Sequence, residues 1–277
     1  MKGKRSNFVS ELRGEEDLFL TYIPFEQSGQ AGISGSQNLI VILQPESDPN
    51  IVFLVLLQTL NTLHDMTKTE QYNNSLKESL ITRTEYIDPQ ELKTLRYSKP
   101  HDTCDNIEIH LGNQAGGFPF HCLGTDWRSV EHLYLCGEFS LEGDLCKTIQ
   151  EDIRTATSGY AAKRYKKSKH KKHMRSDYNT FRIEWMMWCI WQKCLGSEAF
   201  RKHLLSIPAD YTIVEVVKND PIWAAWPNEQ GVLVGQNGVG KILTICRKCL
   251  LDHTTPTINT ELLNEAGIYI LGKRVTF

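Results

Sequence analysis

The chain has 277 residues and a formal net charge of −2, so it can bury a full core and carries no overall positive field that would attract nucleic acid. Its longest apolar run, residues 51–57, is far shorter than the roughly 18 residues of a membrane span. The basic N-terminus lacks the apolar stretch of a signal peptide, so we predict a cytoplasmic protein without membrane contact.

The first part of the chain contains two predicted elements and no catalytic constellation. Residues 38–44 are apolar and predict a strand. Asp48 precedes Pro49 and predicts the start of a helix, because the proline lacks the N–H that would be unsatisfied there. The chain then becomes polar. We therefore expect residues 1–104 to form an N-terminal α/β extension with an accessory role.

The second part of the chain, residues 105–253, contains the elements in which we expect the chemistry. Ser129 is a predicted N-cap, so Glu131 falls in the first turn of the helix that follows. Residues 211–217 predict a strand, and Asp220 is expected to cap a short turn or helix.

A central helix is predicted from the spacing of large side chains. They recur at i, i+4, i+7 and i+11, which indicates one buried helix face. The residues of this stripe are Phe181, Trp185, Trp188 and Gln192. The remaining residues, 254–277, form a tail that ends in a predicted strand.

The eight cysteines are dispersed through a large chain, which predicts free thiols in a reducing compartment and not a disulfide framework. Cys246 and Cys249 form one CxxC pair. No second pair follows at the spacing of a zinc site. We interpret the pair as two thiols on one helix, with a metal or redox site as the alternative, and predict no metal or cofactor.

The sequence LVGQNGVGKI at residues 233–242 is similar to a nucleotide-binding P-loop. Gly235 to Lys241 fit its spacing, but a P-loop requires Ser or Thr after the lysine to ligate magnesium, and Ile242 has no oxygen. Only 36 residues follow Lys241, too few for the rest of an NTPase sheet. The NTPase interpretation is therefore disfavoured.

Three segments in a fixed order resemble the signature segments of the YbiA-like, or NADAR, superfamily. They are WRSVEH at residues 127–132, VVKNDPIW at 216–223 and GQNGVGKILTICR at 235–247. The resemblance extends over residues 107–252 and fits the glycine-rich segment better than a P-loop does. It implies a compact, largely helical α+β fold, with the α/β extension preceding it.

The resemblance also implies an N-glycosidase that cleaves ribosyl N–C bonds. One implied substrate is ADP-ribose on guanine, and the alternative is a ribosylaminopyrimidine phosphate of riboflavin biosynthesis. A non-catalytic module that binds ADP-ribose or a nucleotide is the alternative from another class. The expected partner is in each case an ADP-ribose-containing or ribosyl-phosphate compound.

Glu131 and Asp220 are the candidate catalytic residues. Breaking a ribosyl N-glycosidic bond builds positive charge on C1′, so the site needs an ionised carboxylate near it and a way to activate water. We expect both carboxylates at helix N-termini, which would lower their pKa. The alternative is that each acid only starts its helix.

The other candidate residues are expected to bind the substrate. Trp127, Tyr178 and Trp223 could stack on a base, or could be ordinary core aromatics. Asn237 and Arg247 are expected to hold ribose hydroxyls or phosphate, and two glycines would let backbone N–H groups approach the ligand. The remaining members of this set are Asn113, His132, Gly235, Gly240 and Lys241.

Two features favour one substrate over the other. Glu138 stands where the family usually has a lysine, and its carboxylate is expected to repel the phosphate of a small ribosyl monophosphate. Residues 163–175 contain eight Lys or Arg and two His in thirteen residues. This run is either a solvated face or a contact for the phosphates of nucleic acid or ADP-ribose. Together they favour ADP-ribosylated guanine in nucleic acid.

Overall fold

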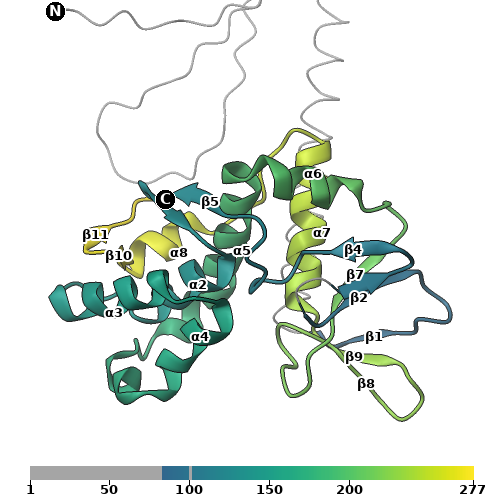
Figure 1. Ribbon diagram of the computed structural model, residues 1–277, viewed down its shortest axis with the longest axis horizontal. Helices are drawn as coiled ribbons and strands as arrows, with labels where there is room; N and C mark the ends of the chain where they lie inside the picture. The colour runs from purple at the N-terminus through teal and green to yellow at the C-terminus, as the bar shows by residue number, and fades with distance from the viewer. Residues whose placement is uncertain (1–82, 100–101) are drawn as a thin grey trace, which may run out of the picture. The chain divides into compact units, whose positions relative to one another are not determined.

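The computed structural model describes residues 83–99 and 102–277 (Figure 1). All of them belong to one compact unit. The strand predicted at residues 38–44 and the helix predicted from Asp48 lie outside the described residues. Within the described part, no helix is long and apolar enough to cross a membrane.

The described residues form helices and small sheets, which confirms the predicted α+β class. The helices are α2 (Val130–Glu138), α3 (Asp144–Thr155), α4 (Gly159–Lys163), α5 (Tyr178–Gly196), α6 (Glu198–Ser206), α7 (Gly238–Leu251) and α8 (Thr260–Glu265), with the 3-10 helices η1 (Arg164–Lys167) and η2 (Lys169–His173). The strands are β1 (Glu85–Ile87), β2 (Thr94–Tyr97), β3 (Asp102–Cys104), β4 (Ile107–Ile109), β5 (Phe120–Cys122), β6 (Thr125–Trp127), β7 (Thr212–Glu215), β8 (Trp226–Pro227), β9 (Leu233–Gly235), β10 (Tyr269–Ile270) and β11 (Lys273–Arg274).

Two strands from the region before residue 105 pair with strands late in the chain. β2 lies parallel to β7, with Leu95 opposite Ile213, and both of these side chains are fully buried. β1 is antiparallel to β9, which also pairs with β8. The end of the predicted accessory region therefore belongs to the same sheets as the predicted catalytic region.

Helix α5 forms the centre of the core, which confirms the predicted helix, although Trp188 and Gln192 of its predicted buried stripe are only half-buried. Phe181 and Trp185 are buried, and Trp188 stacks on Trp185 with ring centroids 5.0 Å apart. Helix α2 crosses close to it at Gly137, where an added Cβ would overlap the Trp185 indole. The indole N–H donates to the Tyr134 carbonyl oxygen at 3.0 Å, which fixes α2 against α5.

Other local predictions can be compared with the structure directly. Ser129 is the N-cap residue of α2, and residues 212–215 form β7, as predicted. Cys246 and Cys249 both lie on α7 and are fully buried. Among the described residues, no group of three His, Cys, Asp or Glu side chains is arranged to hold a metal ion. The C-terminal tail contains α8 and a short hairpin of β10 and β11.

Candidate active site

A cavity of about 140 Å³ lies between the end of β2, the loop after β4, the helices α2, α4 and α5, η1, and the chain after β7. Its wall combines acidic, basic and aromatic side chains. The charged residues that line it are Lys99, Glu131, Lys163, Lys166, Glu215 and Asp220. Four of the residues predicted from sequence line this cavity: Asn113, Glu131, Asp220 and Trp223.

Glu131 is placed in the cavity by the first turn of α2. Its backbone N–H donates to the carbonyl oxygen of Asn113 at 2.8 Å, so the loop after β4 satisfies this helix start. The Asn113 amide in turn donates to Met186 Sδ on α5 at 3.2 Å. Glu131 is 4% exposed, so its carboxylate is held in a fixed, largely desolvated position.

The pKa of Glu131 is raised, and the prediction of a lowered pKa is wrong. Burial favours the neutral carboxyl and outweighs the positive charges of Lys163 and Lys166, which act in the opposite direction. Lys163 Nζ lies 3.5 Å from Glu131 Oε1. A buried carboxylate beside an ammonium group is positioned to accept a proton from a bound water.

Asp220 and Trp223 are placed by a turn, not by a helix. Asp220 Oδ1 accepts a hydrogen bond from the Trp223 backbone N–H at 3.1 Å, and the chain from 221 to 223 makes no further helical turn. The predicted cap at Asp220 is therefore confirmed on a short turn, but the helix N-terminus that was expected to lower its pKa is absent. Trp223 packs edge-on against Tyr134, with ring centroids 5.9 Å apart, and forms one side of the cavity.

Glu215 is an acidic wall residue that the sequence reasoning did not select. It ends β7, and burial together with the charges of Glu131 and Asp220 raises its pKa to about 8, against the opposing charge of Lys163. The sequence feature that could have indicated Glu215 is an acidic residue inside the otherwise apolar run TIVEVV. Lys163 and Lys166 were noticed only as part of the basic run, because sequence does not reveal which of its lysines turn inward.

The family model of the NADAR domain matches residues 100–251, more than half of the chain. The chain belongs to the NADAR family. The NADAR family is associated with N-glycosidase activity. The NMR structure of the E. coli protein YbiA is similar at 22% sequence identity and a TM-score of 0.45, and the match covers 58% of this chain and 86% of that chain. Comparison with curated proteins finds no match.

Three of the predicted substrate-binding residues, which include two aromatics and a histidine, do not line the cavity. Trp127 is fully buried, and its indole N–H donates to the Cys122 carbonyl oxygen at 3.0 Å, so it is a core aromatic and not a stacking surface. His132 is also fully buried, with Nδ1 2.8 Å from the Ser129 hydroxyl. Tyr178 lies behind the wall, edge-on to Tyr134.

The glycine-rich NADAR segment faces the protein interior. An added Cβ would overlap the Ala224 carbonyl oxygen at Gly235 and the Ile213 carbonyl oxygen at Gly240. The Asn237 side chain accepts from the Glu215 N–H at 3.2 Å and donates to the Ile213 carbonyl oxygen at 2.8 Å. These residues therefore hold β7, and none of the three lines the cavity.

Backbone groups of the same segment hold the turn that carries Asp220 and Trp223. The N–H groups at 236–239 donate to the carbonyl oxygens of residues 221–224 over 2.7–3.2 Å. These hydrogen bonds join only main-chain atoms of the two segments. The main chain at the start of α7 therefore supports one wall of the cavity.

The last two predicted residues also have structural partners. Arg247 donates to the carbonyl oxygens of Ile207 and Pro208 at 3.3 and 3.0 Å, so it binds the chain that follows α6. Lys241 Nζ pairs with Glu85 Oε1 at 2.8 Å and thereby ties α7 to β1. Neither residue lines the cavity.

We expect Gly240→Ala to destabilise the fold by about 2 kcal/mol, because the new methyl group would displace Asn237 or β7. The measurement is chemical denaturation of the purified protein. Gly117→Ala is the matched control, since an added Cβ there meets no atom within 4 Å. Equal stability of both variants, with weaker ligand binding only for the first, would instead support a ligand contact at Gly240.

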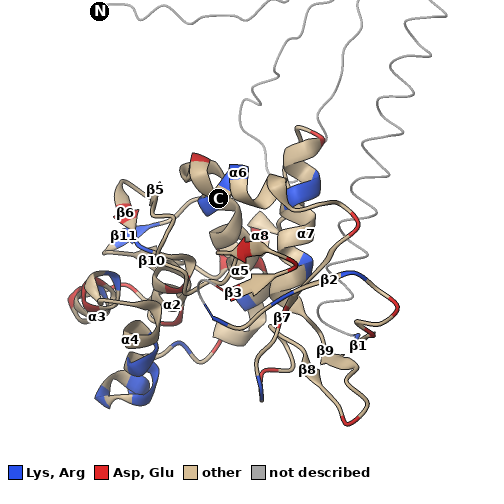
Figure 2. Ribbon diagram, turned by 45° about the vertical axis from the view of Figure 1, so that its right-hand side comes forward, with Lys and Arg blue, Asp and Glu red and all other residues tan. Residues whose placement is uncertain are grey.

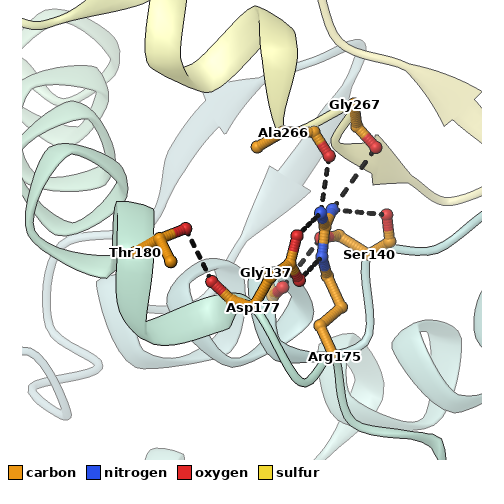
Figure 3. Close-up of polar contacts among 7 residues, drawn as sticks. All are labelled: Gly137, Ser140, Arg175, Asp177, Thr180, Ala266 and Gly267. Carbon is orange, nitrogen blue, oxygen red and sulfur yellow. Dashed lines mark hydrogen bonds and ion pairs between the residues drawn. The ribbon is translucent and has the colours of Figure 1, made fainter.

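The basic run has three different environments. Lys163 and Lys166 line the cavity. Arg175 is buried and structural: its guanidinium pairs with Asp177 at 2.7 Å and donates to the Ala266 and Gly267 carbonyl oxygens (Figure 3). The basic residues between these ends belong to η1 and η2, and the ribbon next to α4 shows a group of blue segments there (Figure 2). The exposed cationic residues are Arg164, Lys167, Lys169, Lys171 and Lys172.

Proposed function

We propose that this protein is an N-glycosidase that removes ADP-ribose from ADP-ribosylated guanine in nucleic acid. The observation that carries the proposal is the meeting of Glu131, Glu215 and Asp220 at one cavity whose wall also contains three lysines. N-glycosidic cleavage needs a carboxylate near the developing cation, a base for water and an acid for the leaving group. The association of the NADAR family with this activity supports the proposal.

Glu131 is assigned two roles: it accepts a proton from the attacking water, and it stabilises the positive charge that develops on C1′. As the C1′–N bond breaks, its electron pair goes to the nitrogen of the leaving base, and positive charge develops on C1′. Water then forms the new C1′–O bond and transfers a proton to the Glu131 carboxylate. Lys163, 3.5 Å from Glu131 Oε1, helps to keep that carboxylate ionised before the reaction.

Glu215 is assigned the role of general acid, with Asp220 as a second anion near the cation. Burial and the neighbouring carboxylates raise the Glu215 pKa to about 8, so this side chain carries a proton at neutral pH. The proton passes to the leaving base and compensates the electron pair that the base receives. Two carboxyl groups in different protonation states can thus perform the two proton transfers.

We expect Glu215→Gln to lower kcat/KM by about 100-fold. In the unmutated protein, activity should fall as pH rises through about 8, because the acid then loses its proton. The variant should lack this descending limb. The measurement is the pH dependence of base release from pH 6 to about 9.5; an unchanged descending limb in Glu215→Gln would assign the limb to another group.

The expected effect of Glu138 on substrate choice requires correction. Its carboxylate is 2% exposed and forms an ion pair with Lys166, so it does not face the cavity as an uncompensated negative charge. Repulsion of a small ribosyl phosphate therefore no longer supports the larger substrate. Support for nucleic acid comes from the exposed part of the basic run, which continues from the cavity wall at Lys163 and Lys166.

Direct product analysis tests the proposal. The protein is incubated separately with ADP-ribosylated guanine DNA and with a ribosylaminopyrimidine phosphate, and both reactions are followed by mass spectrometry. Release of unmodified guanine DNA and ADP-ribose supports the proposal. Cleavage of only the small compound favours the alternative substrate. Ligand that binds in calorimetry but stays intact after long incubation would identify a non-catalytic module.

We expect the nucleic-acid reaction to be strongly salt-dependent. If the exposed basic residues contact phosphates, kcat/KM on modified DNA should fall steeply between about 50 and 200 mM salt. Replacing Lys167, Lys169, Lys171 and Lys172 with Gln should flatten this dependence and leave cleavage of a free ADP-ribosyl nucleoside nearly unchanged. Equal losses on both substrates would contradict a nucleic-acid contact. Lys166 is excluded from the set because it lines the cavity.

A further inference from the structure

Glu138 occupies an unfavourable position for an acidic residue. It is the last residue of α2, where the carbonyl ends of the helix disfavour negative charge. It is 2% exposed, and burial raises its pKa despite the opposing charge of Lys166. Its Oε2 atom has no hydrogen-bond partner among the described residues. A buried carboxylate with one ion pair and one unsatisfied oxygen contributes little stability.

The partner of Glu138 lies on the surface of the cavity. Lys166 belongs to η1, its side chain is 36% exposed, and its ammonium pairs with Glu138 Oε1. Lys166 lines the cavity and Glu138 does not, so the ion pair connects a side chain of the cavity wall to a buried carboxylate behind it. An ammonium group has three donors, and this ion pair occupies one side of it.

The segment that carries Lys166 is also packed against the catalytic helix. An added Cβ on Gly159 would lie 3.1 Å from Glu131 Cβ and from Gln114 Cα, so the start of α4 contacts the cavity wall directly. Lys163 and Lys166 follow within two turns. Three lysines line the cavity. Lys163 is paired with Glu131 and Lys99 lies on the exposed chain after β2, so Lys166 is the one held by a buried carboxylate that takes no part in the proposed chemistry.

We propose that Glu138 is a positioning residue that holds the Lys166 ammonium at the cavity wall, where it binds the phosphate of a ribosyl substrate. This inference rests on the proposed function for the ribosyl part of the ligand. The ion pair with the buried Glu138 carboxylate restricts the flexible Lys166 side chain to one preferred position. Less conformational entropy is therefore lost when the anion binds. A phosphate ester, whose oxygens form charge-assisted hydrogen bonds with ammonium groups, is the ligand class that fits.

Binding measurements test this inference without requiring turnover. The full chain is titrated with ribose 5-phosphate and with ribose in a calorimeter, and the ratio of the two affinities is the readout. The unmutated protein should prefer ribose 5-phosphate. Lys166→Ala should reduce this preference by about 10- to 100-fold, the usual range for one hydrogen bond to a charged group. Lys166→Arg should retain part of it.

Glu138→Gln separates positioning from packing. The amide keeps the volume of the side chain, so the thermal midpoint should change little, but the preference for the phosphate should fall because Lys166 is no longer held. Lys202→Ala and Glu198→Gln are the matched controls, since these residues form an exposed ion pair on α6, 2.7 Å long, away from the cavity wall.

The outcomes are distinct. An unchanged affinity ratio in Lys166→Ala, or equal binding of both sugars by the unmutated protein, would overturn the phosphate contact. A loss in Lys166→Ala with no loss in Glu138→Gln would overturn the positioning role. Ribose 5-phosphate binding that responds to both variants, in a protein that cleaves neither proposed substrate, would support this inference while the proposed N-glycosidase activity fails.

Discussion

Glu131→Gln is expected to reduce base release by about 1000-fold or more while the protein remains folded. The amide cannot accept the proton of the attacking water and offers no negative charge to the developing cation, and each factor of ten corresponds to about 1.4 kcal/mol of lost transition-state stabilisation. Burial already raises the Glu131 pKa, so a neutral side chain of the same size should be tolerated there. The measurement is single-turnover release of the base.

The control for this variant is Glu229→Gln, a charge-neutralising change in an exposed turn. Circular dichroism and the thermal midpoint should be similar for both variants and the unmutated protein. Turnover of Glu131→Gln near the unmutated rate would refute the role of Glu131. Binding of the uncleaved substrate by this variant would show that the cavity itself is intact.

Lys193→Met is expected to stabilise the fold by several kcal/mol at neutral pH. The Lys193 side chain is fully buried on α5, and its amine has no hydrogen-bond partner within the described residues. It lies over the Phe200 ring, 4.2 Å from the centroid, and burial lowers its pKa from 10.5 to about 7. A shift of this size costs on the order of 4 kcal/mol at and below about pH 7, and progressively less as the pH rises towards 10.5.

The pH dependence follows from the direction of this shift. Because the folded protein disfavours the charged amine, its stability should fall as pH decreases from about 10.5 to about 7, and the Lys193 contribution should be constant below that. Lys193→Met should lack this slope. His203, whose pKa burial lowers below 6.5, acts in a separate window at lower pH.

Denaturation at several pH values checks this prediction, with Lys202→Met on exposed α6 as the control. The free energy of unfolding of Lys202→Met should be close to that of the unmutated protein at every pH. If Lys193→Met is less stable than the unmutated protein at pH 7, or keeps its slope between pH 7 and 10.5, the amine is better satisfied in the folded protein than its buried position indicates.

Elements with a strong periodic pattern were predictable from the sequence. Helices α2 and α5 and strand β7 formed where the cap residue and the spacing of apolar side chains indicated. Of the candidate site, Glu131, Asp220, Trp223 and Asn113 reached the cavity wall. These residues lie beside the ends of elements that come together in the fold. The match to the NADAR signature segments therefore indicated that they lie near one another.

The remainder of the site depends on contacts that sequence does not display. The raised pKa of Glu131 follows from burial by distant segments, and this burial outweighs the helix start that was visible in the sequence. The inward direction of Lys163 and Lys166 depends on how α4 packs on α2. Gly235 and Gly240 were correctly recognised as positions of close approach, but the approaching groups are carbonyl oxygens of the protein itself.

The backbone support under Asp220 and Trp223 has a consequence for how this site can diversify. Since main-chain groups at 236–239 and 221–224 hold the turn together, the identity of the side chain at position 223 is not needed to keep the turn in place. We therefore expect the turn to persist when Trp223 is replaced, so that a single substitution changes the size and polarity of one cavity wall. Selection for a new leaving group, in nature or in the laboratory, has its simplest starting point at Trp223.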